Sequence, residues 1–418
     1  MERVRRYSLI CVLCIYMLFC GSQMLLINSG GSISHYLFFV WLLSVLFLEP
    51  RRIQKVLTSR EIIWLLVFVF FQLLSTFFSY NFNVAIHRTI GLFEAISPIW
   101  MYLILKDSDE TVYKTVSILS FLFVLFNIVR IYIILKDSFL GLRQGVSGDE
   151  MDVSLFHAVY SFVLLTTGVV CLIKAHYNKV LAVSKMELFI LMMLLLALIV
   201  IVARSLFMTA LLSMVIGFVI TLFYGRRHWL LKIVIVLALF AALFVVFFDL
   251  FTSGLFGSIT NDNGFLVRRF GEINSVLSGG GTEDSDLGAR SSLFGNSFRT
   301  FVTHPLFGIN HHVSSGESTL YVAIGNHSEW IDSLALYGIF AFCLFIYMIQ
   351  SVSIRYRSIL FPVFIVYFIL GVLNPVFYFP QNVMVFFIVP CLYDCFTHRE
   401  NDSGRFDTDT LPQECLSR

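Results

Sequence analysis

The sequence predicts an all-α polytopic membrane protein with about twelve transmembrane helices and one long external loop between the ninth and tenth. Hydrophobic residues make up 58% of the chain and charged residues 13%, whereas an average soluble domain has about 25% charged residues. The apolar residues, among them 45 phenylalanines, are gathered into long runs. One polar interval, from about Phe251 to Trp330, separates these runs. A loop that long is uncommon in a compact protein and usually carries function.

The apolar runs can be counted as spans, because a bilayer core about 30 Å thick requires roughly 20 apolar residues per helix. They lie near residues 7–27, 34–49, 61–79, 89–105, 115–135, 153–173, 186–203, 205–224, 230–251, 329–350, 357–375 and 381–396. The first run follows the basic start MERVRR, but it is too long for a signal peptide and lacks a small-residue cleavage site. We therefore expect a retained span there. The stretch 186–224 is too long for one span, and we expect a tight hairpin at Arg204.

The distribution of basic residues predicts the orientation. Segments on the side of the N-terminus hold 20 of the 29 lysines and arginines, and such an excess marks the cytoplasmic side. We therefore expect both termini in the cytoplasm and the long loop outside. This division places helices 1–9 in residues 1–251, an external catalytic loop in 252–328, helices 10–12 in 329–398 and a cytoplasmic tail in 399–418.

Cysteine and histidine usage argues against several classes of function. None of the eight cysteines falls in the external loop, so no disulfide framework is expected there. The loop contains His304, His311 and His312, but neither a cysteine nor an i, i+4 histidine accompanies them, and we expect no metal. The chain has no Walker or dinucleotide glycine motif and no basic, aromatic-rich polar platform. We therefore expect no cofactor and no nucleic-acid partner.

Arg204, in the run VIVARSLFMTALL, is a candidate functional residue. An arginine at membrane depth is costly, and by default it marks a functional site. The alternative is an arginine whose head group extends to the outer interface, as Arg130 would from the fifth span. We expect Arg204, rather than Arg130, to belong to the site.

Arg290 and Arg299 are separated by helical periodicity. A helix that begins near Asp286 and stops at His304-Pro305 is predicted inside the loop. At 100° per residue, one stripe of this helix contains Arg290, Phe294, Ser297, Phe298 and Phe301. Arg299 lies on the opposite side, towards water. An arginine on the apolar side needs an anionic partner, and a lipid phosphate that merely anchors the helix is the alternative.

His327, in the segment GNHSEWIDSLALYG, directly precedes the tenth predicted span. Asn326 or Ser328 can cap that helix, which places His327 at a helix N-terminus. The positive end of the helix dipole disfavours the imidazolium ion there. A neutral histidine can accept a proton, whereas the alternative is a structural histidine at the membrane interface. If His327 is not a base, Glu329 and His311 are the next candidates.

The architecture and motifs resemble the family of O-antigen ligases and Wzy-type O-antigen (capsular repeat-unit) polymerases. The resemblance rests on an arginine at the eighth span, the loop sequence GARSSLFGNSFRTFVTHPLFGIN and the segment GNHSEWIDSLALYGIFAF. Its most specific parts are residues 204–230 and 288–340, with the HPLFG motif at His304 to Gly308 and the Tyr337-Gly338 pair. Family members often continue HPLFG with a G-x-G turn, where this chain has Gly-Ile-Asn.

The resemblance implies a metal-independent, inverting glycosyltransferase of GT-C type at the outer face of the bacterial cytoplasmic membrane. Its donor would be an undecaprenyl-pyrophosphate-linked oligosaccharide, and its partners would include membrane lipid and a chain-length regulator. Arg204 and Arg290 would bind the pyrophosphate, because guanidinium groups suit phosphate oxygens. His327 would be the general base for the acceptor hydroxyl. Substrate contacts would come from Arg143, Arg299, Asn310 and His311.

Two acceptors and one further class of protein remain open at this stage. A polymerase extends another lipid-linked repeat unit, whereas a ligase transfers the chain to the lipid A core. We expect the polymerase, because repeat-unit polymerases are the more numerous and more variable in sequence. A flippase or transporter would instead be expected to have charged or broken helices in the membrane interior and short loops.

Overall fold

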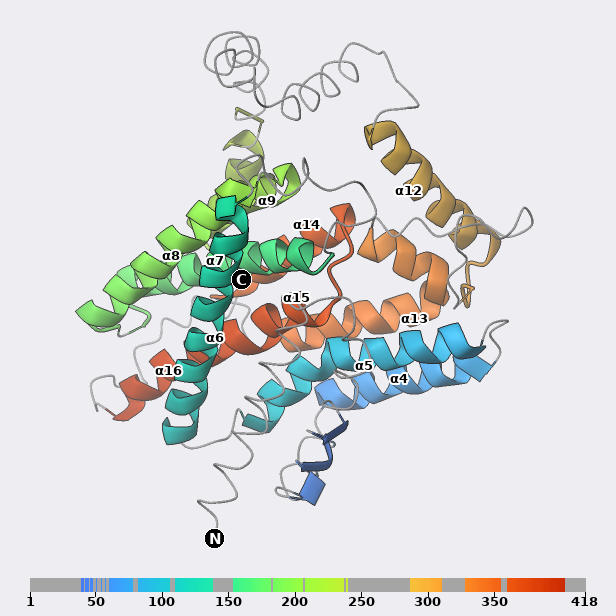
Figure 1. The fold of residues 1–418 in the computed structure, drawn as a ribbon, viewed down its shortest axis with the longest axis horizontal. Helices are drawn as coiled ribbons and strands as arrows, with labels where there is room; N and C mark the ends of the chain where they lie inside the picture. Colours follow the sequence, from blue (N-terminus) through green and yellow to red (C-terminus); the bar gives the residue numbers. More distant parts are fainter. Residues whose placement is uncertain are drawn as a thin grey trace.

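The computed structural model describes the chain as helices and their connections. The described residues are 39–40, 42–44, 46–47, 50, 54, 57, 60–77, 82–105, 110–137, 153–181, 183–205, 207–236, 238–239, 286–309, 328–354 and 359–402. All regular secondary structure within these residues is helical, as predicted (Figure 1).

The helices follow the apolar runs of the sequence. The first group is α4 (Arg60–Phe77), α5 (Phe82–Leu105), α6 (Glu110–Asp137), α7 (Val153–Tyr177), α8 (Lys185–Ser205) and α9 (Met208–Phe223). The second group is α12 (Asp286–Thr303), α13 (Glu329–Ile354), α14 (Phe361–Leu373), α15 (Phe379–Val383), the π-helical turn η2 (Met384–Ile388) and α16 (Val389–Asp402). The predicted break at Arg204 is confirmed, because α8 ends at Ser205 and α9 begins at Met208.

Four described helical segments are long and apolar enough to cross a membrane, which supports a membrane-embedded protein. They are Phe156–Tyr177, Lys185–Ser205, Glu329–Tyr347 and Phe379–Thr397. Shorter apolar helices are Thr89–Leu105, Ile118–Ile133, Thr209–Phe223 and Phe361–Leu373. Of the twelve predicted spans, 7–27 lies outside the described residues, and 34–49 and 230–251 are described only in part. The count of twelve and the course of the external loop therefore stay predictions.

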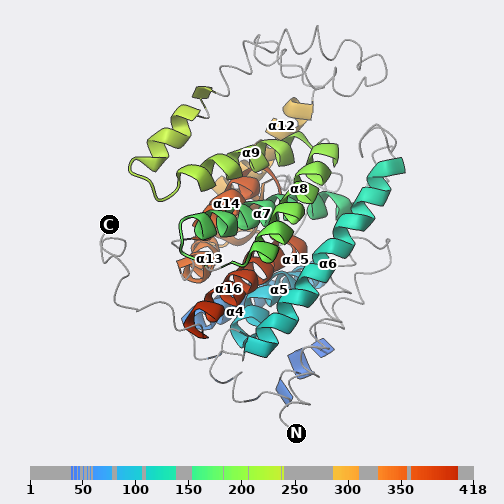
Figure 2. The ribbon, with the colours of Figure 1, turned by 90° about the vertical axis from the view of Figure 1, so that its left-hand side faces the viewer.

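Helix α7 is the centre of the bundle. Four consecutive residues, from Phe162 to Leu165, are fully buried, and at 100° per residue such a run covers the whole circumference of a helix. Its neighbours are α8, α9, α14 and α15, and Figure 2 shows α7 enclosed among them. By contrast, 28% of the apolar window of α8 is buried, against 89% for α7. The exposed side of α8, with Phe189 and Met193, is apolar and therefore suits contact with lipid.

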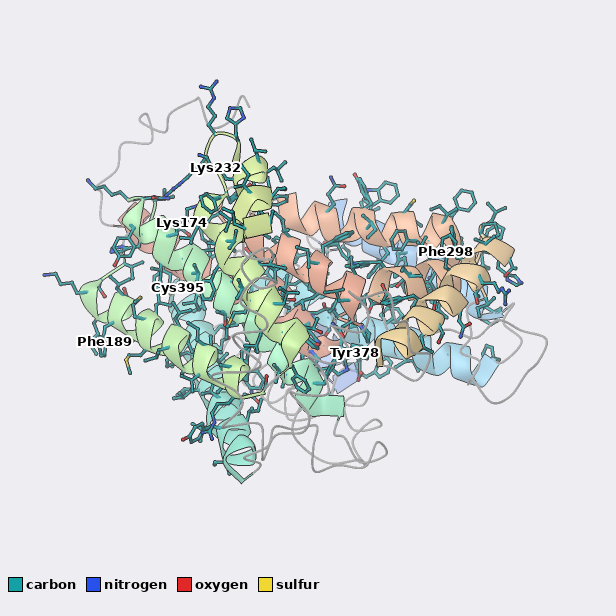
Figure 3. The ribbon with its side chains drawn as sticks, turned by 90° about the horizontal axis from the view of Figure 1, so that it is seen from above. Lys174, Phe189, Lys232, Phe298, Tyr378 and Cys395 are labelled. Carbon is teal, nitrogen blue, oxygen red and sulfur yellow. The ribbon has the colours of Figure 1, made fainter. Side chains whose placement is uncertain are left out.

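A lysine in the last turn of α7 forms hydrogen bonds with the C-terminus of α9. The Lys174 ammonium donates to the carbonyl oxygens of Thr221, at 2.6 Å, and Tyr224, at 2.8 Å. These carbonyls lie at the C-terminus of α9, where a helix lacks internal partners for its last C=O groups and where positive charge is favourable. Figure 3 shows Lys174 and Lys232 at one end of the molecule and Phe298 at the other. The sequence predicts that the segments containing these two lysines are cytoplasmic, and the orientation stays a prediction.

Candidate functional site

The amphipathic helix predicted inside the polar interval is α12, and its ends agree with the prediction. It runs Asp286–Thr303 and stops immediately before His304-Pro305. Ser297 and Thr300 are fully buried, and Arg299 is exposed. Arg290 precedes Ser297 by seven residues, about two helical turns, so the two positions are in register along the helix.

The buried face of α12 is narrower than the predicted stripe. Phe294 and Phe301 are half-buried, as the stripe requires, but Phe298 is 60% exposed. Phe298 thus belongs to the predicted stripe but lies outside the contact with α13. The physical reason is that α12 packs on the single helix α13 through its small polar residues. A side chain about 100° around the helix from Ser297 lies beyond that contact.

Asp332 joins α12 to the start of α13. Its Oδ1 accepts a hydrogen bond from the Ser297 hydroxyl, and its Oδ2 accepts one from the backbone N–H of Ser328, at 3.1 Å. The Ser328 hydroxyl in turn accepts the N–H of Ile331, at 3.4 Å, which is the contact of a helix N-cap. The predicted cap at Ser328 is confirmed. Through Asp332, α12 is held against the first turn of α13.

Glu329 accepts hydrogen bonds from the segment that connects α14 to α15. Its Oε2 accepts the backbone N–H groups of Val376, at 3.1 Å, and Phe377, at 2.9 Å. Its Oε1 accepts the hydroxyl of Ser333, at 3.3 Å. The carboxylate thus fixes the connection between α14 and α15 against the start of α13. With its oxygens engaged in this way, Glu329 is a positioning residue, and the geometry does not favour it as a second base.

The HPLFG motif docks on the Tyr337-Gly338 pair. The N–H of Ile309 donates to the Ala335 carbonyl at 3.1 Å, and the N–H of Ile339 donates to the Pro305 carbonyl at 2.8 Å. Gly308 and Gly338 both have positive φ, at 63° and 70°. Figure 1 shows the orange ribbon of α13 turning sharply beside the trace that follows α12.

Both glycines are required by this approach of two backbones. A Cβ on Gly308 would lie 2.3 Å from the Leu336 carbonyl, and one on Gly338 would lie 2.3 Å from the Leu306 oxygen. Backbone atoms at that distance cannot be displaced as a flexible side chain can. A positive φ is also unfavourable for residues with a Cβ. The two motif segments therefore form one interlocked joint, which we call the Gly308–Gly338 joint.

Arg204 lies in the last turn of α8, away from α12. Its guanidinium carbon is 5.6 Å from the ring centroid of Tyr132 on α6, a cation–π contact. Within the part of the chain that the structure describes, no acidic side chain pairs with Arg204. Its helix packs on α6, α7 and α9. Among the described residues, therefore, the positive charge of Arg204 contacts an aromatic ring and no acidic side chain, which suits an anionic ligand.

The other predicted site residues are placed only in part. Arg290 belongs to α12 and Arg299 is exposed on the same helix. Arg143, Asn310, His311 and His327 lie outside the described residues. Among the residues that are described, no group of three or more His, Cys, Asp or Glu side chains could hold a metal ion.

Comparison with known proteins assigns no family: no protein-family model matches the sequence, and a search of curated proteins finds no match. The residues and their geometry are therefore what supports a function.

Sequence reasoning missed three of the polar contacts around these motifs. Asp332 and Glu329 are both within the first turn of α13, where acidic residues are expected for the helix dipole alone. Asp332 accepts the N–H of Ser328 as the acidic residue of a capping box does, but it lies one position later than that motif requires, so the sequence did not indicate it. Nothing in the sequence indicates that Ser297 or the N–H groups of Val376 and Phe377 are their partners.

Proposed function

We propose that the protein is a polysaccharide polymerase of Wzy type, a metal-independent inverting glycosyltransferase with an undecaprenyl-pyrophosphate-linked donor. The observation that carries the proposal is the docking of α12, which contains Arg290 and Arg299, on the N-terminus of α13 immediately after His327. The candidate phosphate-binding helix thereby packs on the helix that begins two residues after the candidate base in the sequence. Apolar helices of spanning length supply the membrane setting that a polyprenyl substrate requires.

The arginines would act on the leaving group. Pyrophosphate leaves readily, so the protein mainly has to bind it and neutralise its developing charge. Arginine is suited to this role because its guanidinium stays protonated and donates two parallel hydrogen bonds to phosphate oxygens. Arg290 on α12 and Arg204 on α8, which has no acidic partner among the described residues, are the proposed ligands, with Arg143 and Arg299 as further contacts.

His327 would act on the acceptor. A sugar hydroxyl of a second lipid-linked repeat unit attacks the anomeric carbon of the donor as the pyrophosphate departs. The imidazole accepts the hydroxyl proton, a step typically worth about 10²- to 10⁴-fold in rate. The N-terminus of α13, capped by Ser328, favours the neutral ring. One direct displacement inverts the anomeric configuration.

The test is polymer formation in sealed membrane vesicles supplied with lipid-linked repeat units. We expect the wild-type protein to lengthen the glycan with no net flux of substrate across the membrane. Net flux without lengthening would contradict the proposal and favour a flippase. Transfer to the lipid A core in place of a second repeat unit would identify a ligase.

Two arginine variants make the same assay specific. Arg290→Ala should abolish polymer formation with protein still present in the membrane, and Arg290→Lys should restore little, because a point charge does not reproduce the guanidinium fork. Arg299→Ala, on the exposed side of α12, is the matched control and should have the milder effect. Equal losses at the two positions would mean that the helix contributes only bulk positive charge.

A further inference from the structure

The exposed part of α12 has an apolar side and a polar side. Phe298 and Val302, one turn apart, are 60% and 58% exposed. Arg299 and Thr303 are also exposed, and each lies about 100° further around the helix than the apolar residue before it. The contact with α13, made through the buried Ser297, is on a third side. The helix is therefore amphipathic on the surface that α13 leaves uncovered.

The apolar side of α12 continues into the HPLFG turn. Leu306 and Phe307 of that turn are exposed. The ring of Phe307 nevertheless stacks on the ring of Phe71 in α4, with the centroids 6.3 Å apart. Its centroid also lies 6.0 Å from that of Phe340 in α13, which is exposed as well. An apolar surface thus runs from α12 through the turn to α13 and α4.

The contact between Phe307 and Phe71 indicates the depth of the turn in the membrane. Phe71 lies more than one helical turn before Phe77, the last residue of α4. The exposed residues Phe70, Leu74 and Phe77 recur every three or four positions, so they form one apolar stripe on α4. A stripe of this kind on a membrane-embedded protein marks contact with lipid. The turn therefore lies level with the lipid-facing part of α4, and not beyond its end.

The backbone of the turn is paired as this depth requires. In a regular helix the N–H of Ile339 would donate to the carbonyl of Ala335, but Gly338 between them has a non-helical backbone. The Ala335 carbonyl instead accepts the N–H of Ile309, at 3.1 Å. The N–H of Ile339 donates to the carbonyl of Pro305, at 2.8 Å. Irregular backbone is tolerated at membrane depth where the protein itself satisfies such groups.

The shape and polarity of this surface fit a lipid bilayer better than a single bound molecule. A site for one small ligand is concave and encloses most of it, whereas Phe298 and Phe307 remain more than half exposed. A bilayer instead covers a broad apolar surface and leaves the polar side of an amphipathic helix among its head groups. Arg299 suits that position, because guanidinium groups bind phosphate oxygens.

We propose that the C-terminal half of α12 and the HPLFG turn are inserted into the outer leaflet of the membrane. Phe298, Val302, Leu306 and Phe307 contact lipid chains, and Arg299 lies among the head groups. The depth is about 5–10 Å, as for other amphipathic helices that lie in the interface. The outer leaflet follows from the predicted orientation. The insertion itself does not depend on the proposed glycosyl transfer.

The experiment identifies what touches this surface in the full-length protein, reconstituted in phospholipid nanodiscs. The photoreactive residue p-benzoylphenylalanine replaces Phe298 or Val302 on the apolar side. In matched controls it replaces Arg299 or Thr303, the adjacent exposed positions. After irradiation, the mass of the protein shows what has been attached. We expect several-fold more phospholipid adduct at the two apolar positions than at the two polar ones, because excited benzophenone inserts into the C–H bonds of acyl chains.

Four outcomes would overturn the insertion. Equal phospholipid adducts at all four positions would show that α12 does not lie in the interface, and no adduct at the apolar positions would place them in water. Cross-links within the chain or between two copies would show that protein covers the surface. Phospholipid adducts that are replaced by adducts of an added undecaprenyl-pyrophosphate-linked donor would assign the surface to the substrate's polyprenyl chain. Polymer formation is measured separately, so failure of the insertion is distinguishable from failure of the proposed function.

Discussion

At the scale of single residues, the start of α13 shows how neighbouring acidic side chains take different roles. Asp332 holds α12 through Ser297, and Glu329 holds the backbone of the connection that follows α14. Both carboxylates are committed to protein donors. Their hydrogen bonds give both carboxylates a positioning role at the start of α13.

The residue-scale prediction separates binding from chemistry. His327→Ala should still bind the lipid-linked donor, because the pyrophosphate contacts belong to Arg204 and Arg290, yet it should lose most of its turnover. The expected increase in the barrier is about 3–5 kcal/mol, the equivalent of a general-base factor. Donor binding and the initial rate of the purified variant are the measurements. A parallel loss of binding and rate would make His327 a pyrophosphate ligand or a structural residue.

The proposal that His327 is the general base also predicts how turnover depends on pH. If neutral imidazole is the base, wild-type turnover should fall on acidification, because the protonated ring cannot accept the hydroxyl proton. Residual activity in His327→Ala should lose this dependence. An acid limb that persists in the variant would belong to another group.

At the scale of elements, the Gly308–Gly338 joint sets where α12 lies. The joint combines two backbone hydrogen bonds with two glycines at positive φ. It therefore fixes the C-terminal end of α12 against α13. The hydrogen bond from Ser297 to Asp332 fixes α12 at a second place. Two attachments on one helix restrain its rotation as well as its position.

The element-scale prediction compares glycines. Gly338→Ala should lower the thermal midpoint of the detergent-solubilised protein and its polymer formation, because its φ of 70° and ψ of 177° lie in a region that essentially only glycine adopts, at a cost of about 1–3 kcal/mol for other residues, and the added Cβ meets backbone atoms. Gly295→Ala is the control, since a Cβ there meets nothing within 4 Å and alanine favours the interior of α12. A harmless Gly338→Ala would show that α12 does not depend on the joint.

At the scale of the whole molecule, the placement of charge predicts the orientation in the membrane. Lys174 and Lys232 lie at the end opposite α12, and α8 presents an exposed apolar side that suits lipid. With that basic end in the cytoplasm, α12 and the N-terminus of α13 face outwards. The proposed donor would then be met on the outer side.

The whole-molecule prediction is topological. Ser278 belongs to the external loop predicted at residues 252–328, so a cysteine introduced there should react with a membrane-impermeant maleimide in intact cells or spheroplasts. A cysteine in the predicted internal segment at Ser184 should react only after lysis. The reverse pattern of labelling would invert the topology and place the candidate site on the cytoplasmic side.

The sequence by itself determined the local features of this protein. Hydrophobic periodicity and stop signals predicted the helices, the break at Arg204, both ends of α12 and the cap at Ser328, because each depends on neighbouring residues. Only the tertiary structure decided the pairings, such as His157 with Gln381, Glu329 with the N–H groups after Asn374, and the Gly308–Gly338 joint. Those contacts join distant parts of one chain, and their geometry follows from how apolar helices pack. The exposure of Phe298 has the same origin: periodicity defines the face of a helix, whereas the neighbouring helix decides how much of that face is buried.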